Sequence, residues 1–534
     1  MLIWFLLSQP PEYTTDTVMV LGTRLPPGFS EAMSSVWTMD SSWLSRLPWH
    51  FDRALLFSPG LWIRNRGLPG VQCDIGIGPG NYTQTSLMVN GFRCDDPQTA
   101  HHSADIPLGL AEIERVEVAR GGASGLSGPG ASSGAVNLVT AEPIKGTRAD
   151  AFVGSFGTAG TGMELGNGWL SVGMAGERSD GPQKGSDYRT LRGFQKARIG
   201  TASVFAGYSW KGFGAWNFYA PYPSREWTSS GLITINWEGI RFGMRRHTDR
   251  FLLLEHDPSF YENNHVKTSA SCSWNKAIGP STIGLEASWW ELRSDRLGYH
   301  QAPSGALVCQ TGIGSGPLVL ALGARGDWQY GPGFAPSLNG GISCLEGELK
   351  GRISGSLATR FPSATEMYYQ DPGNKGNPGL LPERTKRGEI ALGWRCIDLG
   401  AFVAEYENLI DWVRDSGIWE AVNLKGIRAY GGWAELKTWW LFFGWWYQKK
   451  LAEADRESKY ALRTPSNSIK AGVPWLFLSW EDGRCLISFR VSLSRGPFTL
   501  SLLGDNLLNQ SYEPVPGLPG PPRALAASLV FKER

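Results

Sequence analysis

The stretch LEGELKGRISGSL, residues 345–357, alternates between apolar or small residues and polar or charged ones. The same alternation runs through 240–245 and 486–493, and it recurs from about Arg148 to the end of the chain, broken by turn residues. Successive side chains of a β-strand point to opposite faces, so the pattern predicts strands with one apolar face and one polar face.

Alternation alone fits either a soluble sandwich or a transmembrane barrel, because the apolar face meets a second sheet in one and lipid in the other. Residues 148–534 show no helical interlude, and they would supply about 22 strands of roughly 17 residues with their turns. Closing so many strands into a barrel also removes the exposed edges. Several tryptophans near the expected strand ends fit an interfacial aromatic girdle, with core packing as the alternative: Trp210, Trp237, Trp412, Trp439 and Trp440.

The composition of the 534 residues narrows the class further, since 68 are glycine, 24 are tryptophan and only 19% are charged. The longest apolar run, Trp439–Trp446, falls far short of the ~18 residues that a membrane-spanning helix requires. A net charge of +2 gives no basic surface for nucleic acid. An aromatic content of 12% argues against disorder.

The first 145 or so residues have a different, glycine-punctuated pattern that predicts a small α+β domain. Short strands are expected at Ser86–Val89 and Val136–Val139, and Ala111–Val118 resembles a helix end that runs into a strand. No long linker separates this domain from the strands that follow, so we expect the two to pack closely.

Motifs for catalysis or metal binding are weak. The glycine-rich segment Gly121–Gly134 lacks the Gly-Lys-Ser/Thr ending of a phosphate loop, so its glycines are expected to allow tight turns. His101 and His102 lie near Asp95 and Asp96, but adjacent side chains of an extended chain point to opposite faces, which disfavours chelation. We therefore expect no resident metal and no cofactor.

The seven cysteines show no paired zinc spacing, although Cys73 and Cys94 could form a disulfide in an oxidising compartment. The chain has no nucleophile elbow and no convincing Ser/His/Asp set, so an enzyme is not expected.

Five groups of segments together resemble the TonB-dependent outer-membrane receptors. Asp16, Thr17, Val18, Met19 and Val20 look like the TonB box of that family. The segments that resemble its plug and its barrel are 70–75, 85–91, 96–102, 113–122 and 133–140, then 213–228, 245–265, 360–383 and 408–412, and finally 505–512 and 520–523.

The resemblance implies a transmembrane barrel of about 22 antiparallel strands with an α+β plug inside its lumen. It divides the chain into a remnant leader at 1–15, a TonB box at 16–20, a plug at 21–145 and a barrel at 148–534. Two features depart from the family pattern. Ile77-Gly78 stands where an Ile-Arg-Gly is common, and Lys532, Glu533 and Arg534 follow the aromatic end at Phe531.

The resemblance also implies active uptake of a scarce, bulky ligand across the outer membrane of a Gram-negative bacterium. The implied partners are the C-terminal domain of TonB with its inner-membrane energising complex, membrane lipid and a small-molecule ligand. The segments 213–228 and 245–265 are similar to the cobalamin-receptor subgroup, which favours cobalamin or another corrinoid, followed by a ferric siderophore or haem. A passive porin or structural barrel is the alternative from a different class.

Aromatic and amide side chains at the expected plug apex and in barrel loops are the ligand-binding candidates, since they suit a large ligand that is both apolar and hydrogen-bonding. They are Asn81, Tyr82, Gln84, Asp96 and Gln98 in the plug, and Trp216, Tyr219, Tyr222 and Tyr261 in the barrel. Strands of about 9 to 11 residues leave little chain for elaborate loops. A small ligand, or a surface lipoprotein that caps the site, is therefore expected.

Overall fold

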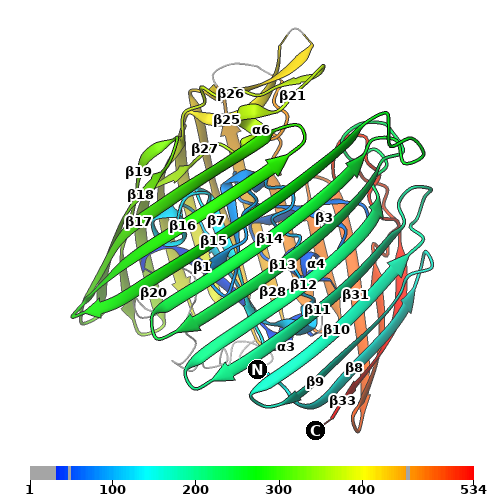
Figure 1. The fold of residues 1–534 in the computed structure, drawn as a ribbon. Coiled ribbons are helices and arrows are strands. Elements are labelled where there is room, and N and C mark those ends of the chain that lie inside the picture. Colours follow the sequence, from blue (N-terminus) through cyan, green and yellow to red (C-terminus); the bar gives the residue numbers. More distant parts are fainter. Residues whose placement is uncertain (1–31, 46–49, 416, 453–456, 534) are drawn as a thin grey trace.

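The computed structural model describes residues 32–45, 50–415, 417–452 and 457–533, and it has two parts, a closed barrel and a plug inside it (Figure 1). The expected TonB box and the remnant leader lie outside the described residues. None of the described helices is long and apolar enough to span a membrane.

The barrel is a single closed sheet of 22 antiparallel strands, in chain order except where loop strands intervene, and its last strand pairs with its first. This confirms the predicted architecture. The strands are β8 (Lys145–Gly154), β9 (Ala159–Asn167), β10 (Leu170–Ser179), β11 (Tyr188–Ile199), β12 (Ala202–Gly214), β13 (Arg225–Trp237), β14 (Ile240–Leu252), β15 (Glu262–Ile278), β16 (Ser281–Ser294), β17 (Gly298–Ser315), β18 (Leu318–Gln329), β19 (Gly333–Glu346), β20 (Leu349–Arg360), β23 (Glu383–Trp394), β24 (Ile397–Glu407), β27 (Ile427–Lys437), β28 (Phe442–Leu451), β29 (Asn467–Val473), β30 (Leu476–Glu481), β31 (Arg484–Arg495), β32 (Phe498–Asp505) and β33 (Ala524–Lys532).

The alternating stretch 345–357 is divided between β19 and β20 by a tight turn at Gly347, where φ is +61°. A two-residue turn preserves the alternation, which is why the sequence pattern continues across it. The apolar set faces outward, with Leu345 and Ile353 58% and 65% exposed, whereas Arg352 points inward and is buried. An apolar outer wall around a polar lumen is typical of a barrel in lipid.

The plug fills the lumen with a five-stranded sheet in the order β1-β6-β7-β4-β5 and a separate β2-β3 hairpin. The predicted helix end and strand at Ala111–Val118 are confirmed as η2 and β6. The plug elements are β1 (Ser35–Asp40), α3 (Ser41–Leu44), α4 (Phe51–Leu55), β2 (Leu61–Arg66), β3 (Gln72–Ile77), η1 (Tyr82–Gln84), β4 (Thr85–Val89), β5 (Phe92–Arg93), η2 (Leu110–Glu112), β6 (Ile113–Arg120), α5 (Ser124–Ser127) and β7 (Gly134–Thr140).

The long connections lie at one end of the barrel, opposite the end where the C-terminus lies (Figure 1). Two of them join into a four-stranded sheet above the barrel, so the expectation of little loop structure was wrong. Most turns at the other end use only two residues, such as Gly200-Thr201, which leaves chain for a few large loops. The loop elements are α6 (Ala364–Tyr368), β21 (Gln370–Asp371), β22 (Asn374–Lys375), β25 (Leu409–Asp415) and β26 (Ile418–Leu424).

The tryptophans expected at the membrane interface divide into two groups. Trp237 and Trp439 are 49% and 57% exposed, as a girdle requires. Trp412 does not belong to it, because its side chain is buried with Leu380 and Ile410 in the core of the loop sheet. The sequence pattern misplaced it because loop strands and barrel strands have the same alternation. Cys73 and Cys94 are both buried free thiols and form no disulfide.

Ion pairs fix the plug to the barrel wall. Arg64 in β2 lies 3.1 Å from Glu481 in β30, and Arg53 in α4 lies 2.9 Å from Asp505 in β32. Arg120 at the end of β6 pairs with Glu435 in β27, and the side chain of Arg120 is only 3% exposed. A buried arginine that loses its counterion keeps its desolvation cost, so each pair ties plug and barrel strongly.

We predict that Glu435→Gln loosens the plug, because Arg120 would stay buried without a counter-charge, at a cost of about 3–5 kcal/mol. The measurement is thiol labelling of the buried plug cysteine Cys94 over a urea series, read by peptide mass, and the midpoint should fall. Glu348→Gln is the matched control, since Glu348 pairs with Arg395 on the surface, and it should leave the midpoint unchanged. Equal midpoints for Glu435→Gln and the wild type would contradict this role.

Candidate functional site

An aromatic cluster lies where the plug meets the large loops. The ring of Tyr82, in η1, stacks on His101 with ring centroids 4.3 Å apart, and Tyr460 packs edge-on at 5.5 Å from Tyr82. Asn81 accepts hydrogen bonds from the backbone and side chain of Thr83, which caps η1 and fixes the position of Tyr82. Plug and barrel loop therefore build one surface from residues distant in sequence.

Polar groups below the cluster hold the His101 ring in place. Nδ1 of His101 lies 2.7 Å from an oxygen of Asp74, whose other oxygen accepts a hydrogen bond from Arg66 at 2.7 Å. Burial acts to raise the pKa of Asp74, but Arg66 and His101 outweigh it and hold that pKa below its ordinary value. With its Nδ1–H donated to this carboxylate, His101 accepts the Tyr82 hydroxyl at Nε2 over 3.1 Å.

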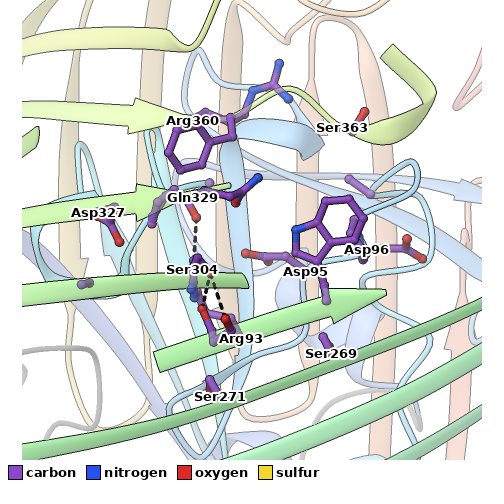
Figure 2. A pocket seen from close by; sticks show the side chains of 18 of the residues that line it. Arg93, Asp95, Asp96, Ser269, Ser271, Ser304, Asp327, Gln329, Arg360 and Ser363 are labelled. Carbon is purple, nitrogen blue, oxygen red and sulfur yellow. Dashed lines mark hydrogen bonds between the residues drawn. The ribbon is translucent and has the colours of Figure 1, made fainter. Parts of the chain in front are cut away.

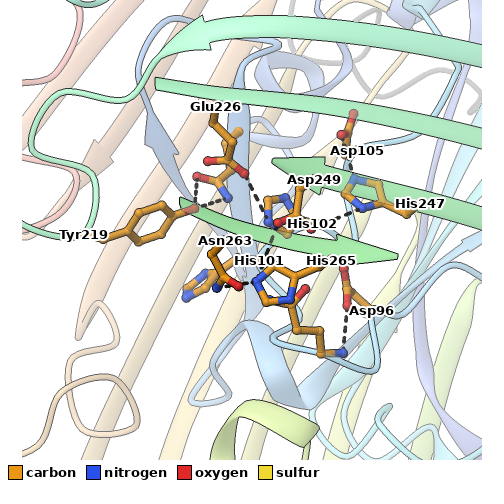
Figure 3. Close-up of polar contacts among 12 residues, drawn as sticks. Asp96, His101, His102, Asp105, Tyr219, Glu226, His247, Asp249, Asn263 and His265 are labelled. Carbon is orange, nitrogen blue, oxygen red and sulfur yellow. Dashed lines mark hydrogen bonds and ion pairs between the residues drawn. The ribbon is translucent and has the colours of Figure 1, made fainter. Parts of the chain in front are cut away.

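The loop between β12 and β13 brings Tyr219 to the same region (Figure 3). The amide of Gln72 in β3 donates to the Tyr219 hydroxyl at 2.9 Å, and the guanidinium of Arg66 lies 5.6 Å from the centre of its ring. Tyr219 is nevertheless 47% exposed, so one part of its side chain anchors the loop to the plug and another part faces outward.

A cavity of about 1150 Å³, counting the part open to solvent, lies between the plug and the wall formed by β15–β20 (Figure 2). Aromatic residues line the cavity, and serines of three wall strands contribute hydroxyl groups. The aromatic residues are Tyr82, Phe92, Trp289, Trp290, Trp328 and Phe361.

Each arginine that lines the cavity is paired with at least one carboxylate. Arg325 lies 3.0 Å from Glu286 and 2.8 Å from Asp327, and Arg93 also reaches Glu286, at 3.0 Å. The third arginine, Arg360, pairs with Glu366 and Glu383 at 2.9 and 2.8 Å. The cavity therefore presents aromatic and hydroxyl groups, and none of its three arginines is without a carboxylate.

The structure places the candidates from the sequence in different settings. Tyr82 and Asp96 line the cavity, and Tyr219 lies at the aromatic cluster. The other plug candidates are buried: Gln84 donates to Glu383, and Gln98 accepts from Lys267, which also pairs with Asp96.

The three remaining barrel candidates lie away from the cavity lining. Trp216 packs against the loop that contains Gly185, and Tyr222 is 40% exposed on its own loop. Tyr261 lies beneath the guanidinium of Arg296, 4.5 Å from the ring centre. No signal in the sequence marks Trp290 and Phe361 of the cavity or Tyr460 of the aromatic cluster, because only the closed barrel and the folded loops bring them to the plug.

Known proteins that are similar to this chain include a plug-domain family and transporters. Residues 51–135 match the model of the TonB-dependent receptor plug domain. The vitamin B12 transporter of Photobacterium profundum is 22% identical over 481 residues, which cover 78% of this chain and 77% of that protein. A vitamin B12 transporter of Vibrio vulnificus is 22% identical over 477 residues, with coverages of 78% and 75%.

Among solved structures, the siderophore receptor PirA of Pseudomonas aeruginosa superposes with a TM-score of 0.69 at 18% identity, covering 93% of this chain and 98% of that one. A ferric enterobactin receptor mutant of the same organism gives 0.71 at 14% identity, with coverages of 94% and 98%. These likenesses show the shared fold.

The plug-domain match and the closed 22-stranded barrel around it support a TonB-dependent receptor, a class of transporter of the Gram-negative outer membrane. That family consists of transport receptors and is not a class of enzymes. Within it, this sequence is similar to the vitamin B12 transporters.

Asp411 in β25 stabilises the loop segment that places Tyr460 over the plug. Its carboxylate accepts hydrogen bonds from the Ser458 hydroxyl and from the backbone of Tyr460, and its side chain is buried. Burial raises the pKa of Asp411 to about 6, against the hydrogen bonds that act to lower it.

The pKa of Asp411 is higher when the 457–462 segment packs over it than when that segment is released, so packing is most favourable while the acid is protonated. The free energy of packing should therefore weaken by up to about 3 kcal/mol as the pH rises from about 4 to about 6. Hydrogen exchange of the 457–462 amides, corrected for intrinsic rates, should show the weakening in the wild type. Asp411→Asn should remove the pH dependence, whereas Glu420→Gln, at an exposed pair with Lys375, should keep it. A pH-independent wild type would contradict the role of Asp411.

Proposed function

We propose that this receptor takes up cobalamin or another corrinoid across the outer membrane, with energy delivered by TonB. The observation that carries the proposal is the open cavity at the plug, whose aromatic and hydroxyl lining and paired arginines suit a ligand with apolar and hydrogen-bonding surface. The similarity to vitamin B12 transporters along most of the chain supports it.

The electrostatics of the cavity favour this ligand class over a highly charged iron chelate. A multiply anionic complex would need cationic groups free to approach it, since transfer of charge out of water is costly unless it is paired. Arg93, Arg325 and Arg360 already have carboxylate partners. A corrinoid needs aromatic contacts and neutral hydrogen bonds, which Tyr82, Trp290 and the wall serines offer.

For contacts to the ligand we propose two groups. Tyr82 and Asp96, with Tyr219 at the aromatic cluster, make the first contacts, together with Tyr460, Trp290 and Phe361. The buried plug groups Asn81, Gln84 and Gln98, and the loop residues Trp216, Tyr222 and Tyr261, take part when the loops or the plug rearrange. A surface lipoprotein over the loop sheet remains a proposed partner.

A ferric siderophore or haem is the second candidate. The observation in its favour is the fold shared with siderophore receptors. This candidate is less favoured than a corrinoid because the arginines of the cavity are already paired with carboxylates.

Calorimetry of the detergent-purified receptor should show cobalamin binding that exceeds binding of any member of a ferric siderophore panel. Tyr82→Ala should weaken it by about 30-fold, as expected when a central aromatic contact is lost, and the double variant with Trp216→Ala should be at least as weak. Tyr299→Ala is the matched control, since Tyr299 is 54% exposed on the barrel exterior. Siderophore binding without cobalamin binding would assign the second candidate instead.

Energy coupling is proposed to enter at Asp16–Val20, a short segment suited to adding as a strand to the sheet edge of a partner. Deleting residues 16–20 should abolish uptake of labelled cobalamin by cells while leaving its equilibrium binding unchanged. A passive porin or structural barrel needs no such segment, so undiminished uptake by the deletion variant would favour that class.

A further inference from the structure

Three side chains that bear metal-ligand atoms converge between the plug and the barrel wall (Figure 3). They are His102 of the plug, Glu226 at the start of β13 and Asp249 in β14. One ligand atom from each lies within 4.8 Å of the others, and the three residues are 5%, 1% and 5% exposed.

The barrel register explains why these groups meet. In β14, His247 and Asp249 are two residues apart and so share the lumen face, and Asp249 lies opposite His265 of β15 and Thr228 of β13. Glu226 precedes Thr228 by two residues and therefore faces the lumen as well. The wall thus presents a patch of imidazoles and carboxylates to the plug segment that carries His102.

Glu226 is the group that this arrangement leaves without a cationic side chain. Its ion-pair contact among the described residues is His102, at 3.4 Å, and its Oε2 has no hydrogen-bond partner. The neighbouring carboxylates are paired, Asp105 with Lys211 at 2.9 Å and Asp249 with Lys267 at 2.9 Å. A buried carboxylate whose charge is not compensated is costly unless it takes up a proton, is paired or coordinates a metal.

His247 is arranged as metal-binding histidines commonly are. Its Nε2 lies 2.9 Å from a carboxylate oxygen of Asp105, so this side of the ring donates to Asp105. Its Nδ1 has no hydrogen-bond partner and lies 3.9 Å from Asp249. A carboxylate that accepts from the far nitrogen fixes the tautomer and aims the other nitrogen at a metal.

We propose that His102, Glu226 and Asp249 bind a divalent first-row transition-metal ion, with His247 Nδ1 as a fourth ligand. A donor set of one or two imidazole nitrogens and two carboxylates suits zinc and the other divalent metals of the first transition row. Ligand atoms at 2.0–2.2 Å on a tetrahedral zinc lie roughly 3.3–3.6 Å apart. His102 and Glu226 already have this spacing, at 3.4 Å, and the ligand atoms of all three residues, which lie within 4.8 Å of one another, would move together on binding. Lys267 contacts Oδ1 of Asp249, which leaves Oδ2 for the metal.

The metal would join the plug to two adjacent strands of the wall. His101 takes no part, because it points to Asp74 and Tyr82 while His102 points to Glu226. Opposite orientation of the adjacent pair was expected from the sequence. The sequence predicts no metal because Glu226 of β13 and Asp249 of β14 are distant from His102 along the chain, and only the closed barrel brings them to it. This inference does not depend on which ligand the receptor transports.

The test is zinc binding by the full receptor in detergent after chelator treatment, followed by calorimetry and metal analysis. The wild type should bind one zinc per chain at this site. Cobalt(II) should bind there too and give visible absorption bands that report nitrogen and oxygen ligation. His102→Ala and Glu226→Gln should each weaken zinc binding by more than about 10-fold, since loss of an outer-shell partner alone costs about 10–100-fold.

His256→Ala and Glu262→Gln are the matched controls, because His256 lies in the loop after β14 and Glu262 is the first residue of β15, both outside the cluster. They should bind zinc as the wild type does. Glu226→Gln preserves the shape of the side chain, so it tests the site even if His102→Ala fails to fold by circular dichroism. Absence of zinc binding by the wild type, equal affinity in Glu226→Gln, or equal loss in the controls would overturn the proposal.

Discussion

The structure depends on matching the polar lumen of a large barrel to the surface of the plug. A closed sheet of 22 strands directs every second side chain inward, and many of these are charged and buried. Arg245 of β14, for example, donates to the backbone carbonyl groups of Cys94, His102 and Asp105 at 2.6 to 2.9 Å. Polar groups of the barrel wall and of the plug therefore serve as each other's hydrogen-bond and ion-pair partners. Either surface alone would lose those partners.

The same matching explains the character of the cavity beside the plug. Arginines that would attract an anion are held by carboxylates that also join plug to wall, as Glu286 joins Arg93 to Arg325. What remains for recognition is aromatic and hydroxyl surface. The plug thereby closes the barrel and forms one side of the cavity, so that any movement of the plug would alter the lumen and the cavity together.

The sequence predicted the fold well because barrel strands are encoded locally. The alternation of apolar and polar residues identifies each strand. A two-residue turn, such as the one at Gly347, lets the alternation continue from one strand into the next. The same local signal misassigned Trp412, since a loop strand alternates in the same way. The site was less predictable, because Tyr460 meets Tyr82, and Glu226 meets His102, only through long-range closure. Residue spacing along the chain carries no information on such contacts.

We propose that ligand crosses only when the plug moves relative to the wall, because the plug fills the lumen of the closed barrel, and a reversible tether tests this most directly. A β-carbon built on Gly125 of the plug would lie 3.6 Å from that of Asn339 in β19, within the range for a disulfide. The variant Gly125→Cys with Asn339→Cys should bind cobalamin when oxidised yet transport none, and reduction should restore transport. Wild-type uptake with the cross-link verified as intact would contradict the account.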